Sequence, residues 1–74
     1  MKLISVQSRG DRLVKIWQTK PVYEARKENK KPFAIYKGEM CLNRGGFKFV
    51  GESHFYQDFS AFKAAAEWLE GATI

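Results

Sequence analysis

The sequence predicts an α+β fold: a small antiparallel β-sheet of three to five strands, followed by one C-terminal amphipathic helix packed across one face. Apolar residues alternate with polar ones through much of the first fifty positions, as they do in strands. Between Asp58 and Gly71 they recur at a helical period instead. On a helical template one apolar stripe forms, made of Phe59, Phe62, Ala65, Ala66 and Leu69. This stripe needs cover, and the strand-like segments upstream can supply it.

The strand signals come in pairs separated by turn residues. Residues 2–6 and 12–19 are rich in β-formers and enclose Arg9-Gly10-Asp11, which predicts a hairpin. Residues 33–37 and 39–42 are strand-like, and Gly38 between them marks a bulge or a bend. A turn at residues 43–46 then leads into a strand at 47–50. The predicted sheet is therefore a meander.

Residues 21–31 carry mixed signals. Pro21 suits the first position of a helix, and several good helix formers follow it. Pro21 equally suits the start of a short strand, and the apolar content is too thin for a helical face. We therefore predict a strand followed by a loop.

The expected helix follows a loop at residues 51–57. Asp58 is the expected N-cap, and Gly71 is the expected C-terminal stop. The expected core is aromatic and consists of Phe33, Phe47, Phe49, Phe59 and Phe62.

The chain of 74 residues is expected to form a single domain spanning 1–74. Its one cysteine, Cys41, cannot form an internal disulfide, and its apolar neighbours predict a buried, inert thiol. The apolar run at the N-terminus is too short for a signal peptide or a membrane span. We therefore expect a soluble protein in the reducing cytoplasm.

No arrangement of residues predicts an enzyme or a bound cofactor. Ser53, His54 and Asp58 are hydrolase residue types, but triads are defined by geometry and not by closeness in sequence. His54 is expected in the loop before the helix. Cys41 and His54 are the only soft metal ligands, whereas a structural zinc site needs four. We expect no metal.

Charge is distributed unevenly along the chain. Residues 1–50 hold twelve Lys or Arg and four acids, a net +8, whereas residues 51–74 carry a net −3. If Val14 and Ile16 face the helix, Lys15 and Trp17 face water, and Lys48 is expected beside them across the sheet. Further cations with access to phosphates are Lys30 and Lys31 in a lysine-rich loop and Arg44 in a glycine-rich turn. These six residues form the expected nucleic-acid-binding set.

One segment resembles a known family in the order of its elements. The run from Phe49-Val50-Gly51 through Phe55 to Ala64-Ala65-Ala66 is similar to the strand, Gly, Phe and Ala-rich helix of AP2-type plant DNA-binding domains. Arm-binding domains of some phage integrases share this plan. The resemblance implies a sheet of about three strands followed by a helix. The arginine and tryptophan pattern with which AP2 sheets read bases is absent here apart from Arg44.

Two functions follow as expectations. The first is a small, non-enzymatic nucleic-acid-binding protein that uses a basic sheet face and its hairpin turns, with DNA favoured over RNA. The second is a compact protein-binding module or inhibitor of phage or mobile-element type, which blocks a nucleic-acid-processing enzyme. Its partner would be a host protein with an acidic surface, and Trp17 or Trp68 would be the anchor.

Overall fold

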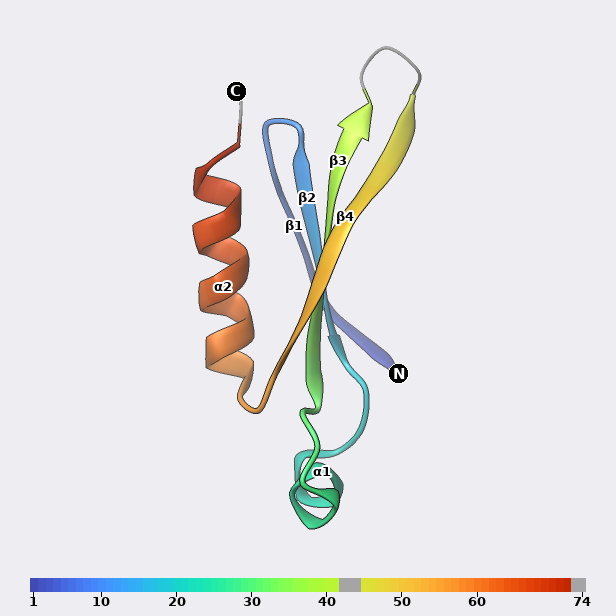
Figure 1. Ribbon diagram of the computed structural model, residues 1–74, viewed down its shortest axis with the longest axis vertical. Coiled ribbons are helices and arrows are strands. Elements are labelled where there is room, and N and C mark those ends of the chain that lie inside the picture. The colour runs from blue at the N-terminus through green and yellow to red at the C-terminus, as the bar shows by residue number, and fades with distance from the viewer. Residues whose placement is uncertain (42–44, 73–74) are drawn as a thin grey trace.

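The computed structural model describes residues 1–41 and 45–72, and of Cys41 only the backbone. Four antiparallel strands form a sheet in the order β1-β2-β3-β4, and one helix lies across one face (Figure 1). The elements are β1 Lys2–Arg9, β2 Arg12–Gln18, α1 Val22–Glu28, β3 Phe33–Cys41, β4 Gly46–Phe55 and α2 Asp58–Glu70. The predicted α+β meander is confirmed. It has one strand more than the AP2-type plan of about three.

Glycines lie in the first hairpin turn and opposite the bulge in the β3–β4 ladder. Gly10 has a φ of 58° in the two-residue turn between the paired residues Arg9 and Arg12. Such positive φ values are readily adopted by glycine. In the β3–β4 ladder, Lys37 pairs with Gly51 and Gly38 pairs with Phe49, which leaves Val50 as an extra residue. The irregularity predicted at Gly38 is thus a β-bulge.

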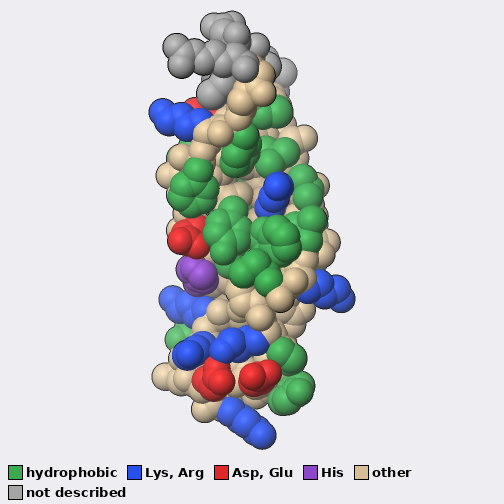
Figure 2. All heavy atoms as spheres, turned by 90° about the vertical axis from the view of Figure 1, so that its right-hand side faces the viewer, with side chains coloured by type: hydrophobic (Ala, Val, Ile, Leu, Met, Phe, Trp, Pro, Cys, Tyr) green, Lys and Arg blue, Asp and Glu red, His purple; other side chains and the backbone are tan. Residues whose placement is uncertain are grey.

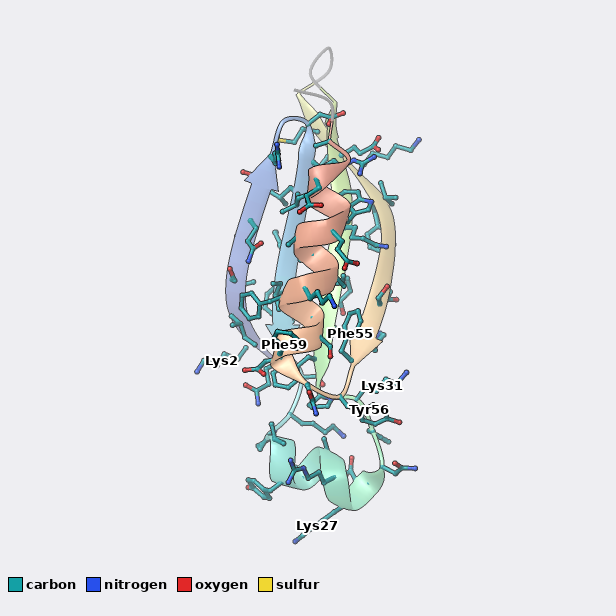
Figure 3. The ribbon with its side chains drawn as sticks, turned by 90° about the vertical axis from the view of Figure 1, so that its left-hand side faces the viewer. Lys2, Lys27, Lys31, Phe55, Tyr56 and Phe59 are labelled. Carbon is teal, nitrogen blue, oxygen red and sulfur yellow. The ribbon has the colours of Figure 1, made fainter. Side chains whose placement is uncertain are left out.

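The core lies between α2 and one face of the sheet. All its members are at most 6% exposed: Val14, Ile16, Phe33 and Ile35 from the strands, and Ala61, Ala65 and Leu69 from α2. The two fully buried alanines let the helix backbone come close to the strands. Phe55 packs at the border of this core, beside α2 (Figure 3).

The predicted aromatic core is only partly correct. Phe33 is buried, and Phe62 is partly buried against the core. Phe47, Phe49 and Phe59 are 50%, 56% and 68% exposed, so their predicted burial was wrong. Alternation placed Phe47 and Phe49 on one face, but a single helix covers only the other face.

The buried side of the helix is shifted from the predicted stripe, of which Phe62, Ala65 and Leu69 do pack against the sheet. Ala61, which was not part of the predicted stripe, is fully buried, whereas Ala66, which was, is exposed. Trp68 and Ala64 pack against the core as well. The Ala and Trp flank of α2 therefore faces the sheet, and Phe59 turns outward.

The segment predicted as strand and loop contains a helix, α1. Pro21 stands at its N-cap, and Asn29 ends it in the left-handed region with a φ of 55°. Ala25 supplies the buried contact, while Lys20 and Glu28 form an ion pair across it. The hydrogen bond from Lys20 and its charge lower the pKa of the Glu28 carboxyl. The Lys20–Glu28 ion pair and the left-handed C-cap at Asn29 thus support a helix that has few apolar residues.

The join between β4 and α2 also differs from the prediction. Residues 51–55 continue the strand, so His54 lies in β4 and not in a loop. Gln57 is the N-cap, and Asp58 is the first helical residue, whose Oδ1 accepts a hydrogen bond from the Phe59 amide at 2.7 Å. Gly71 is the C-cap, as predicted.

Arg12 ties the sheet to the C-terminal end of α2. Its Nη1 donates a 2.6 Å hydrogen bond to the Trp68 carbonyl, and its guanidinium lies 4.7 Å from the centroid of the Trp68 ring. A cation at a helix C-terminus interacts favourably with the carbonyls that have no partner within the helix. Trp68 is therefore part of the packing between helix and sheet and not a free docking anchor.

Candidate functional site

The face of the sheet opposite α2 is uncovered, and we call it the open face. Residues that pair directly across neighbouring strands point to the same side of a sheet. Because Val14 and Ile16 face α2, Leu13, Lys15 and Trp17 belong to the open face. Their partners on β3 are Gly38, Tyr36 and Ala34. The expectation that Lys15 and Trp17 share the side away from the helix is confirmed.

The open face is apolar over most of its area. Figure 2 shows hydrophobic side chains clustered around a single cation on this side of the molecule. Leu3, Val6, Met40, Phe47 and Phe49 lie here and are between 37% and 56% exposed. Leu13, Trp17 and Tyr36 add partly exposed surface. Contiguous exposed apolar patches of this kind are frequent at interaction sites, which makes the open face the candidate surface of this chain.

Aromatic rings are packed against one another within this patch. The ring of Phe47 occupies the position where a Cβ would stand on Gly38, since its Cζ is 1.8 Å from that point. Tyr36 and Phe49 lie with ring centroids 6.4 Å apart and tilted by 45°. Gly38 thus lets the Phe47 ring lie flat on the strand. Any larger residue at this position would push the ring off.

Few charges interrupt the patch. Lys15 is exposed, and Glu52 lies on the same face, separated from it by Tyr36. The Glu52 Oε2 is 3.4 Å from Nε2 of His54. Within the part of the chain that the structure describes, Lys15 has no carboxylate at ion-pair distance. Among the described residues the open face therefore presents one cation and one acid, whereas the sequence predicted a basic face.

The six predicted nucleic-acid-binding residues do not form one site. Lys48 pairs with Glu39 and alternates with Phe47 and Phe49, so it lies on the opposite side of the sheet from Lys15 and Trp17. Its predicted place beside Lys15 was wrong. Lys30 and Lys31 follow α1 at one end of the molecule, and Arg44 lies outside the described residues.

Cations do gather at the α1 end. Residues 20–31 hold five Lys or Arg against two acids. A hollow of about 210 Å³ lies here between α1 and the start of α2, lined in part by Arg26, Lys30 and Tyr56. Lys31 Nζ is 5.3 Å from the centroid of the Tyr56 ring (Figure 3). Residues 20–31 thus carry a net charge of +3.

The structure brings no catalytic or metal-binding group together among its described residues. Ser53 and His54 are consecutive in β4, so their side chains point to opposite faces and cannot form a nucleophile and base pair. No cluster of three or more His, Cys, Asp or Glu is placed to hold a metal ion within residues 1–41 and 45–72. None of the described helices is long and apolar enough to cross a membrane.

The sequence analysis did not predict that Phe47, Phe49, Tyr36 and Met40 belong to the open face, which is the candidate surface. One available signal was that apolar residues occur on both sides of the predicted strand 12–19. A single helix of 13 residues covers one side of a sheet only. The surplus of apolar side chains therefore pointed to a second, unoccupied face.

Comparison with protein-family models, with curated proteins and with solved structures finds no match to this chain. The likeness to AP2-type domains remains one of element order.

Proposed function

We propose that the protein is a protein-binding module that docks a partner on the open face of its sheet. The observation that carries this proposal is the exposure of five large apolar side chains, Leu3, Val6, Met40, Phe47 and Phe49, on one uncovered face. Covering such a surface removes apolar area from water, which drives protein association. The enzyme class of the partner, expected from the sequence to process nucleic acid, stays a prediction.

The composition of the face defines the chemistry of the partner. The partner needs an apolar surface to match the aromatic and aliphatic side chains, an acidic group opposite Lys15 and a basic group opposite Glu52. An isolated charge enclosed in such an interface loses its hydration without compensation. A uniformly acidic partner surface, as expected from the sequence, would leave Glu52 facing like charge.

Replacing Phe49 with Asp is expected to abolish partner binding, because it puts a charge at the centre of the apolar patch. Phe59→Asp is the matched control, since Phe59 is 68% exposed at the start of α2, away from the open face. The measurement is the dissociation constant of each variant for a protein captured from nuclease-treated lysate. Equal binding by wild type and Phe49→Asp would contradict the proposal.

Nucleic acid is a second candidate for the same face. Trp17 and Tyr36 lie beside Lys15 on the open face, and the ring of Phe49 lies next to that of Tyr36. Sheets with exposed aromatics bind single strands by stacking bases on the rings while cations contact phosphates. The cation-rich α1 end offers further phosphate contacts to such a strand.

If single-stranded DNA binds by stacking, Phe49→Ala is expected to weaken binding by about 1–3 kcal/mol. Lys48→Ala, on the other side of the sheet, is the control and should change affinity little. Titration of an oligonucleotide while Trp17 and Trp68 fluorescence is recorded, repeated at several salt concentrations, gives the affinities. Binding that is undetectable at low salt would eliminate this second candidate.

A further inference from the structure

The open face has a regular arrangement of charge and apolar surface across three strands. Its central row is Lys15, Tyr36 and Glu52, which pair directly from β2 through β3 to β4. The rows on either side have no fixed charge. They are Leu13, Gly38 and Phe49 on one side, and Trp17, Ala34 and His54 on the other.

We propose that the partner of the open face is the open face of a second copy, related by a twofold axis that runs along β3 through Tyr36. This inference rests on the proposed function, because it names the partner of the same surface. Rotation about an axis parallel to the strands exchanges the β2 side with the β4 side. Lys15 of each copy then lies opposite Glu52 of the other, and two ion pairs form. A second copy of the open face thus supplies both the acid that Lys15 needs opposite it and the base that Glu52 needs.

The charges also exclude the other simple arrangement. An axis in the plane of the sheet but perpendicular to the strands would put Lys15 on Lys15 and Glu52 on Glu52. Like charges placed face to face in an interface disfavour it strongly. The position of one cation and one acid on the two sides of β3 therefore selects the axis.

The neighbouring rows are compatible with the same axis. Leu13 would lie against Phe49, and Trp17 against His54, so that apolar and aromatic surfaces meet. Tyr36 and Gly38 lie on the axis, where the Phe47 ring covers Gly38 and fills the space above it. Facing sheets pack about 10 Å apart with strands rotated by about 30°, which keeps the residues nearest the axis in contact.

The area of the face sets the expected strength of association. With the axis along β3, the strands that overlap are β2, β3 and β4, and β1 lies outside the overlap. These three strands have 7 to 10 residues and give, at about 3.3 Å per residue and about 4.8 Å between strands, roughly 400 Å² of projected area per copy. Two copies then bury about 800 Å², which is the size of weak, transient contacts. We therefore expect a weak, reversible dimer with a dissociation constant of about 10–100 micromolar.

The direction of the twofold axis decides where the two basic α1 ends lie in the dimer. Because it runs along the strands, it keeps both α1 helices at the same end of the dimer. The cations of residues 20–31 from the two copies would then form one larger positive surface.

A charge exchange tests the dimer directly. Sedimentation equilibrium of the purified protein is compared for wild type, Lys15→Glu, Glu52→Lys and the double variant that carries both changes. Each single variant is expected to dimerise about tenfold or more weakly, because it brings like charges together, and the double variant is expected to recover wild-type affinity within about threefold. Lys15 and Glu52 are both exposed, so at protein concentrations well below the dissociation constant all four proteins should keep the wild-type circular dichroism spectrum and melting temperature.

Several outcomes would overturn the dimer. They are a wild type that stays monomeric at several hundred micromolar, single variants that dimerise as the wild type does, and a double variant that is not rescued. A monomer that still binds another protein through Phe49 would refute the dimer while leaving the proposed function standing. A monomer that binds single-stranded DNA through Phe49 would refute both. Rescue in the double variant supports the twofold arrangement.

Discussion

Replacing Ile16 with Ala is expected to lower the free energy of unfolding by about 2–5 kcal/mol. Ile16 is fully buried at the centre of the core between the sheet and α2. Its truncation removes apolar contact and leaves a cavity that a well-packed core closes only in part. A chain of 74 residues has a total stability of roughly 4–11 kcal/mol. The variant is therefore expected to be largely unfolded at physiological temperature or close to it.

Val6→Ala is the matched control for this substitution. Val6 pairs with Lys15, next to Ile16 in β2, but it belongs to the open face and is 50% exposed. Its truncation should cost less than about 1 kcal/mol in the monomer. Urea denaturation at low protein concentration, followed by circular dichroism, gives both values. Similar losses for the two variants would mean that the helix does not cover the face that carries Ile16.

Ala61→Leu is expected to destabilise the protein by about 1–3 kcal/mol. Ala61 is fully buried where α2 approaches the sheet, and its small side chain sets the distance between them. A leucine there has no free space and forces the helix away from Val14, Ile16 and Ile35. The melting temperature should fall accordingly.

Ala66→Leu makes the same change on the exposed side of α2. Leucine is nearly as good a helix former as alanine, so stability should change by less than about 0.5 kcal/mol. The pair also tests the rotation of the helix, because the apolar stripe seen in the sequence includes Ala66 and omits Ala61. A larger loss for Ala66→Leu than for Ala61→Leu would favour the helix orientation predicted from the sequence.

The candidate surface was predictable in part. Alternation in β2 was enough to separate Lys15 and Trp17 from Val14 and Ile16, and the structure confirms this separation. Alternation in β4 was equally regular, yet it left open which side faces the helix. The bulge at Val50 adds a residue between Phe49 and Gly51, so the strand's side chains change face partway along its length. Lys48 was misplaced for a different reason: Phe47 and Phe49 were expected in the core, but their side of the strand is the uncovered one.

The sequence by itself determined the kind and order of most elements. The two hairpins, the bulge at Gly38, the C-terminal helix and its stop at Gly71 depend on local backbone preferences and on periodicity, and each was predicted. The short helix α1 was not predicted. The helix is stabilised by the ion pair between Lys20 and Glu28 and by the burial of Ala25. Both depend on the folded chain and leave no periodic pattern in the sequence.

Only the tertiary structure decided which apolar side chains are buried. Periodicity assigns residues to one side of a strand or helix, but it does not say which side meets a partner element. One helix can cover one face, so Val14, Ile16 and Ile35 join the core, whereas Phe47 and Phe49 on the other face remain exposed. The open face is thus a product of the packing of α2, because contacts between segments far apart in the chain decide which face is buried.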